Sequence, residues 1–236
     1  MRKLIVGMMV VCLVGGVLLT DSLYGKGKKD GYIVALKLDK VEREPGLEQN
    51  IPIKDGKLFD SVPFALVWAP APQGFRFRVY NKLQSPLLIL WNECKFIDEK
   101  GNSHNITHQG VKRPSLSEMK AMQPRSVEVG GNWQDVIFPF DSDYILHEKE
   151  LVSFNDAGAD AARTYGKAGL RIRPIFIDKY KEKQVKKIVK NQSKKDKNFN
   201  FETYINDHTY KVVVALRFND TKYLYTFFFR AYLLDN

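Results

Sequence analysis

Two segments near the C-terminus alternate between apolar and polar positions with the period of two that is typical of a β-strand. In residues 209–218 one face carries Tyr210, Val212, Val214, Leu216 and Phe218. In residues 223–233 one face carries Tyr223, Tyr225, Phe227, Phe229, Ala231 and Leu233. The four residues between them, Asn-Asp-Thr-Lys, have the chemistry of a hairpin turn. The pattern predicts an antiparallel hairpin at the end of the chain.

Residues 81–110 carry a second strand signal. Residues 87–97 are rich in branched and aromatic side chains and predict a central strand, buried on both faces in its first half and on one face in its second. Residues 98–101 have turn chemistry, and residues 103–108 predict the returning strand. Cys94 shares a face with Leu90 and Phe96, so we interpret it as a small buried hydrophobe and not as a nucleophile.

Shorter strand signals recur along the chain, with turn residues between them. We expect strands at residues 32–41, 64–68, 74–81, 126–129, 136–140 and 150–154, and at 170–177 on a sheet edge. Residues 42–60 and 111–124 predict irregular segments, and residues 157–163 a short helix. Because no βαβ spacing occurs, the fold class predicted for residues 32–236 is a single, mainly β domain, an antiparallel β-sandwich of immunoglobulin-like type.

The N-terminus differs from the rest of the chain. Arg2 and Lys3 precede an apolar run over residues 4–19, which is the layout of a secretory signal peptide over residues 1–25. No cleavage site is a good match, so an uncleaved membrane anchor through residues 4–19 is the alternative. Cys12 lacks the surroundings of an acylated cysteine. Residues 26–31 form a short basic tether, and we expect an exported protein of the periplasm or cell envelope.

The positive charge is concentrated in one stretch. Residues 171–197 hold eleven basic and three acidic residues, a net charge of +8 out of +10 for the whole chain. Within it, residues 178–198 predict a helix inserted before the terminal hairpin, with a narrow apolar stripe of Val185, Ile188, Val189 and Gln192. Its lysines either keep a solvated connection soluble or dock an anionic partner. The candidate docking residues are Lys186, Lys187, Lys190, Lys194 and Lys195.

That partner is either anionic lipid, lipopolysaccharide or an acidic envelope protein. Nucleic acid is a weaker choice, because no aromatic side chain lies between Lys181 and Asn198 to stack on bases.

Catalytic and metal-binding patterns are weak in this sequence. His104 and His108 are the only close pair of histidines, and on an extended strand they lie about 13 Å apart, too far for one metal ion. The sequence has no Gly-x-Ser-x-Gly elbow and no phosphate-binding glycine loop. We therefore predict no metal and no cofactor. A hydrolase with a site near His104 or His108 is the competing hypothesis, because active sites assembled from distant residues leave no motif.

One set of residues resembles a pattern in uncharacterised exported or lipid-anchored bacterial envelope proteins. The pattern consists of Asn81, Lys82, Pro86, residues 88–91, Phe96, Ile97, Asp98, Gly101, Ser103, His104, Ile106, His108 and residues 110–112, with Tyr225, Thr226 and Phe227 similar to the closing strand. The resemblance implies an envelope location and a β-sandwich, and it implies no activity. Together with the signal layout, it leads us to predict a non-enzymatic binding or assembly module of the envelope.

Overall fold

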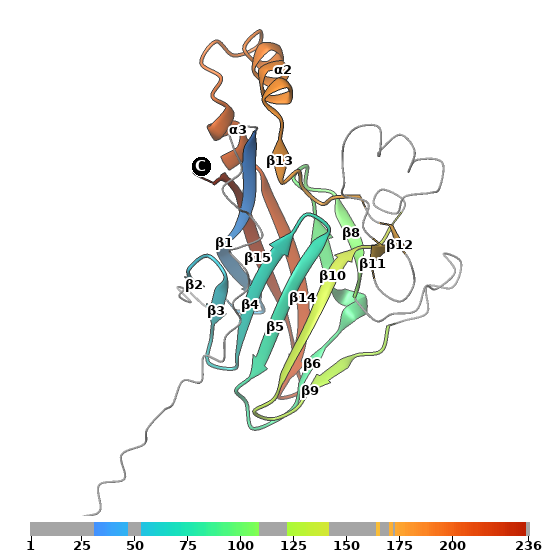
Figure 1. Ribbon diagram of the computed structural model, residues 1–236. Helices are drawn as coiled ribbons and strands as arrows, with labels where there is room; N and C mark the ends of the chain where they lie inside the picture. The colour runs from blue at the N-terminus through green and yellow to red at the C-terminus, as the bar shows by residue number, and fades with distance from the viewer. Residues whose placement is uncertain are drawn as a thin grey trace, which may run out of the picture. The chain divides into compact units, whose positions relative to one another are not determined.

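The computed structural model describes residues 31–46, 53–108, 122–141, 164–165, 170–171 and 173–234, and they form a mainly antiparallel β structure (Figure 1). The first strands are β1 (Tyr32–Glu44), β2 (Ile53–Lys54), β3 (Leu58–Asp60), β4 (Phe64–Ala71), β5 (Gly74–Asn81), β6 (Leu87–Ile89), β7 (Lys95–Ile97) and β8 (Ser103–His108). The later strands are β9 (Arg125–Val127), β10 (Asn132–Pro139), β11 (Thr164–Tyr165), β12 (Leu170–Arg171), β13 (Lys179–Tyr180), β14 (Thr209–Phe218) and β15 (Thr221–Leu233). The helices are η2 (Trp91–Glu93), α2 (Glu182–Gln192) and α3 (Phe201–Asn206).

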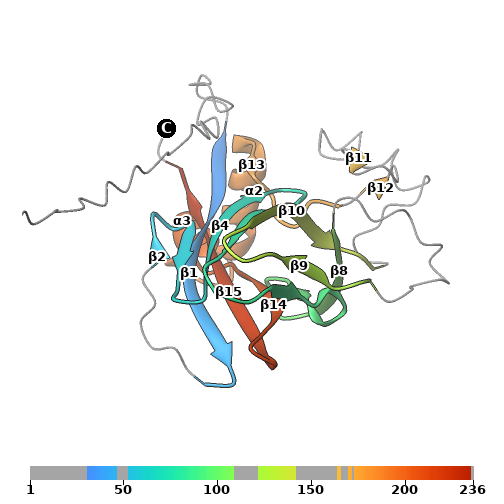
Figure 2. The same ribbon diagram turned by 90° about the horizontal axis from the view of Figure 1, so that it is seen from below.

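One hydrogen-bonded path joins eleven strands in the order β13, β1, β15, β14, β7, β8, β10, β5, β4, β3 and β2. The sheet curls so far that its two ends approach each other. The backbone N–H of Leu38 on β1 donates to the carbonyl oxygen of Gly56, in the turn between β2 and β3, at 2.7 Å. Figure 2 views this curl from the end opposite α2. Because the path is continuous, the immunoglobulin-like arrangement of two separate sheets is not confirmed and stays a prediction.

Aromatic rings from the two sides of the curl fill its interior. Trp68 on β4 packs edge-to-face against Phe227 and Phe229 on β15, with ring centroids 5.1 and 5.3 Å apart. Phe59 on β3 meets Phe227 in the same way at 5.5 Å. These rings are at most 1% exposed. Strands β4 and β15 are not hydrogen-bonded neighbours, so these rings hold the two sides of the curled sheet together.

The terminal hairpin is confirmed. Ten residue pairs join β14 to β15, from Thr209 with Arg230 to Phe218 with Thr221. Asn219 and Asp220 take the two turn positions with φ of 48° and 58°, a left-handed conformation that matches the twist of a two-residue hairpin and that Asn and Asp tolerate.

The predicted single strand over residues 87–97 is wrong. The structure divides it into β6, the 3₁₀ turn η2 and β7, and β14 pairs with both strands. The backbone leaves the strand at η2 because the N–H groups of Glu93 and Cys94 donate to the carbonyl oxygens of Leu90 and Trp91 at 3.0 and 3.1 Å, local bonds that an extended strand cannot form. The turn buries Trp91 and places the Cys94 thiol to accept a hydrogen bond from the backbone N–H of Ala215 at 3.3 Å.

Other boundaries also differ from the predictions. Residues 53–60, predicted as irregular, form the β2–β3 hairpin, and residues 173–177 of the predicted edge strand 170–177 are not strand. The signal or anchor over residues 1–25, the predicted strand at 150–154 and the predicted helix at 157–163 lie outside the described residues. A helix does occur within residues 178–198, as α2, and its character as an insertion in a sandwich stays a prediction.

Candidate functional site

Helix α2 follows β13 and stands beyond the end of the sheet (Figure 1). Its first turn is closed by the side-chain oxygen of Gln184, which accepts a hydrogen bond from the backbone N–H of Lys181 at 2.7 Å. Val185 is 6% exposed, and Ile188 and Val189 pack partly buried against the core. The apolar stripe predicted from the sequence therefore faces the protein body.

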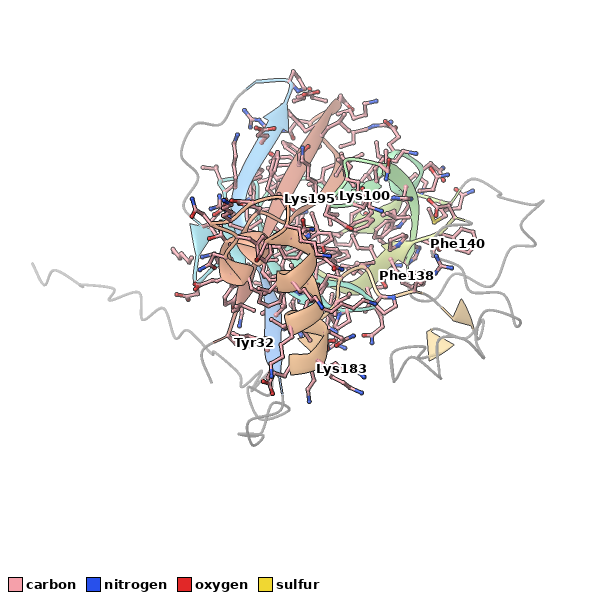
Figure 3. The ribbon with its side chains drawn as sticks, turned by 90° about the horizontal axis from the view of Figure 1, so that it is seen from above. Tyr32, Lys100, Phe138, Phe140, Lys183 and Lys195 are labelled. Carbon is pink, nitrogen blue, oxygen red and sulfur yellow. The ribbon has the colours of Figure 1, made fainter. Side chains whose placement is uncertain are left out.

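The lysines lie on the opposite side of α2. Successive helical residues are rotated by about 100°, which places Lys183, Lys186, Lys187 and Lys190 together, away from the apolar stripe. All four are exposed, as are Lys194 and Lys195 in the turn that follows. We call these six residues the lysine face. Figure 3 labels Lys183 and Lys195, near the two ends of this segment.

The structure brings the five predicted docking lysines together in one continuous segment and adds Lys183. Helical periodicity could have identified Lys183 from the sequence. Among the described residues, one carboxylate is paired with the lysine face: Glu182 lies 2.6 Å from the Nζ of Lys186. The hydrogen bond from Lys186 lowers the pKa of Glu182, and both groups are fully exposed.

The chain enters the described fold beside α2. Tyr32, the first residue of β1, pairs with Tyr180 of β13, one residue before the N-terminal cap of the helix. A Cβ at Gly31 would lie 2.5 Å from the carbonyl oxygen of Tyr180, and φ at Gly31 is +149°, so glycine allows this close approach. The predicted tether, which ends at residue 31, thus joins the body next to the start of the lysine face.

The two candidate histidines on β8 each meet a different aspartate. His104 is 4% exposed, and its Nδ1 donates to the carboxylate of Asp141 at 2.7 Å, while its Nε2 lies 3.5 Å from Asp98. His108 donates from Nδ1 to the buried carboxylate of Asp135 at 2.8 Å, and its ring stacks on Trp91 with centroids 4.4 Å apart. The pairs orient both imidazole rings but do not bring them to one site.

The thiol of Cys94 is buried and unreactive. Burial raises the pKa of the Cys94 thiol to about 12, so it is not a thiolate at neutral pH. Its Sγ donates to the carbonyl oxygen of Leu90 at 3.4 Å. Among the residues that the structure describes, no group of three or more His, Cys, Asp or Glu side chains is placed to hold a metal ion.

A pocket of about 540 Å³ lies between the β7–β8 turn, residues 173–177 and the end of α3. It contains His104 but not His108. It also contains His208, which no sequence pattern linked to His104 because the two are a hundred residues apart and meet only through the strand order. The turn is held by Asp98, which accepts hydrogen bonds from the backbone N–H groups of Lys100 and Asn102 at 2.9 and 2.8 Å.

Two titratable groups of the pocket have shifted pKa values. Burial alone raises the pKa of Asp98, but the hydrogen bonds from Asn102, from the backbone of Lys100 and from His104 outweigh it, so the net pKa lies below the ordinary value. Burial, with smaller contributions from Tyr204 and Glu99, raises the pKa of Tyr180 to about 12. At neutral pH the pocket therefore presents an ionised Asp98 and a protonated Tyr180.

Comparison of the chain with models of known protein families, with curated proteins and with solved structures found no match. The resemblance to envelope proteins therefore stays a prediction. Within the described ranges, no helix combines the length and apolar character needed to cross a membrane.

Proposed function

We propose that this protein is a non-enzymatic binding or assembly module of the bacterial cell envelope that docks an anionic surface through its lysine face. The observation that carries the proposal is the division of α2 into two sides. One side is occupied by contacts with the protein body, and the other side presents lysines to solvent. A charge run that only solubilised the protein would need no such alignment.

The attachment we propose is electrostatic and does not involve insertion of α2 into a bilayer. An amphipathic helix enters a membrane interface through its apolar side, but Val185, Ile188 and Val189 already pack against the body. Each lysine near an anionic membrane contributes about 1 kcal/mol, and the attraction decays over a Debye length of about 10 Å at 0.1 M salt. Binding is therefore strongly salt-dependent.

Among the anionic partners, the position of the tether favours lipid. Eleven residues, 20–30, separate the end of the apolar run at residue 19 from Gly31, and this connection spans at most about 40 Å when fully extended. If residues 4–19 anchor the chain, as the uncleaved alternative predicts, the lysine face is kept near a membrane without any further contact. Lipopolysaccharide and an acidic envelope protein are also negatively charged, and they are the other proposed partners.

The test is co-sedimentation of residues 26–236, which include the compact unit 31–235, with vesicles of anionic or neutral phospholipid across a salt series. The variant replaces the five predicted residues, Lys186, Lys187, Lys190, Lys194 and Lys195, by Gln. We expect it to lose at least about tenfold in apparent affinity for anionic vesicles at low salt.

A matched control keeps the same net charge as this variant. It replaces five exposed lysines elsewhere by Gln: Lys37, Lys40, Lys54, Lys57 and Lys222. If both variants lose the same affinity, the protein binds through its overall charge, and the lysine face has no special role. Equal binding of the wild type to neutral and anionic vesicles would also reject the proposal.

A hydrolase with a site near His104 or His108 is the competing proposal, and the two oriented His–Asp pairs favour it, since an acidic partner fixes the tautomer of a catalytic histidine. Its test is the release of nitrophenol from nitrophenyl esters, phosphates and glycosides by the wild type and by His104→Ala and His108→Ala. A turnover that either variant abolishes, with unchanged circular dichroism, would support the hydrolase. No turnover in the wild type would reject it for these substrate classes.

A further inference from the structure

Four charged side chains line the pocket beside α3. Glu99 and Lys100 line it from exposed positions on the β7–β8 turn. The oxygens of Asp98 are occupied by the turn, with the amide Nδ2 of Asn102 as a third donor at 2.9 Å. Arg173 interacts with another group of the protein. These two acidic and two basic side chains balance in charge. The pocket therefore selects neither an anion nor a cation by its net charge.

Neutral hydrogen-bonding groups remain for a ligand. Nδ1 of His208 lies 2.6 Å from the carbonyl oxygen of Tyr204, and because a carbonyl oxygen only accepts, Nδ1 carries the proton. In the neutral tautomer with this proton, Nε2 is an acceptor. The hydroxyl groups of Tyr180 and Tyr204 both donate and accept, and burial keeps Tyr180 protonated by raising its pKa to about 12.

Apolar groups complete the wall. Ile177 is 51% exposed and Pro174 is half-buried, and both line the same pocket as Tyr204. A ligand that fits must therefore combine several hydroxyl groups, which both donate and accept, with a C–H surface for the aromatic and aliphatic walls. A volume of about 540 Å³ lies within the usual range for small-molecule sites.

We infer that this pocket binds a neutral saccharide of one or two rings. Hydroxyl groups of the sugar bond to Tyr180, Tyr204 and Nε2 of His208, and its C–H face packs on Pro174 and Ile177. This site is separate from the lysine face, since it includes none of the six lysines, and the inference does not rest on anionic docking.

The experiment is saturation-transfer-difference NMR on the full chain in a detergent without a sugar headgroup. The probes are glucose, galactose, mannose, N-acetylglucosamine and maltose, each up to about 10 mM. Sulfate and tetramethylammonium serve as anionic and cationic competitors. We expect saturation transfer to at least one sugar, with no displacement by either ion.

The variant Tyr180→Phe/Tyr204→Phe removes two hydroxyl groups and keeps both rings, which limits the risk of unfolding. Because each hydrogen bond contributes a fewfold in affinity, we expect the sugar to bind about tenfold more weakly. The control Tyr223→Phe/Tyr232→Phe removes two hydroxyl groups from β15 outside the pocket and is expected to leave binding unchanged.

Three results would overturn the inference: no saturation transfer to any of the sugars, equal affinity in both double variants, or displacement of the sugar by either ion. The five-lysine variant described above keeps full sugar binding if the two sites are separate. A chain that binds sugars but not anionic vesicles would therefore disprove the docking proposal and leave this one intact.

Discussion

Strand β15 and helix α2 each have an apolar and a polar side, but they differ in how much of the apolar side is buried. On β15 the middle of one side is buried, with Tyr225, Phe227 and Phe229 at 0% exposure, and these rings contact the far side of the curled sheet. On α2 only Val185 is buried, and the other side presents charge to solvent. The comparison indicates that stability is concentrated in the aromatic interior, whereas the end of the molecule around α2 and α3 is available for binding at little cost to the fold.

The sharpest test of this division uses two neighbouring rings on β15. Phe227→Ala removes a ring that packs on Trp68 and Phe59, and we expect it to cost about 3–5 kcal/mol of unfolding free energy. Phe228→Ala removes a half-buried ring that lies between Lys40 and Lys211 on the outer side, so its cost is about 1 kcal/mol. Denaturant unfolding measures both. Equal losses would show that the interior is not the main source of stability.

The second prediction tests a buried charge on β10. The side chain of Asp135 is 3% exposed, and His108→Ala on β8 leaves its carboxylate with only the hydrogen bond from the backbone N–H of Val136, so we expect a cost of about 3 kcal/mol. The control is Asn105→Ala at an exposed position of the same strand, with a cost of about 0.5 kcal/mol. The prediction fails if the two variants unfold at the same denaturant concentration.

The smallest effect is expected at the α3 end and depends on pH. The folded-state pKa of Tyr180, about 12, lies above its ordinary value, so folding favours the protonated phenol. This contribution is fully present below about pH 10 and is lost as the pH rises from about 10 toward 12. The variant Tyr180→Phe should therefore lose less stability over that interval than the control Tyr232→Phe. Parallel curves of unfolding free energy against pH for the two variants would contradict the shift.

The sequence predicts the fold well where the local pattern of apolar and polar residues is enough to determine the structure. Residues 209–233 alternate without interruption, and the predicted hairpin is present with its turn at Asn219 and Asp220. The prediction failed at residues 87–97 because the packing of Leu90 and Trp91 overrides the strand preference of the local sequence. Residues 53–60 were missed because the β2–β3 hairpin is short and polar and is held by Leu38, fifteen residues or more away.

The candidate sites differ in the same way: a site within one helix can be predicted from the sequence, whereas a site built from distant segments cannot. The lysine face could be predicted because a helix converts sequence spacing directly into one side of a surface. The pocket could not, since His104, Tyr180 and His208 come from three elements that only the pairing of β7 with β14 and of β1 with β13 brings together. The aspartate partners of His104 and His108 lie 37 and 27 residues away, which no local pattern records.

The pairing of β1 with β15 also determines when this protein can fold. The first strand of the described fold is hydrogen-bonded along most of its length to the last, with Val34 opposite Leu233 and Glu44 opposite Leu224. Residues close to the C-terminus must therefore be synthesised before the first strand has its neighbour, and contacts this distant in sequence form slowly. Until β15 has left the ribosome, the nascent chain cannot close this part of the sheet.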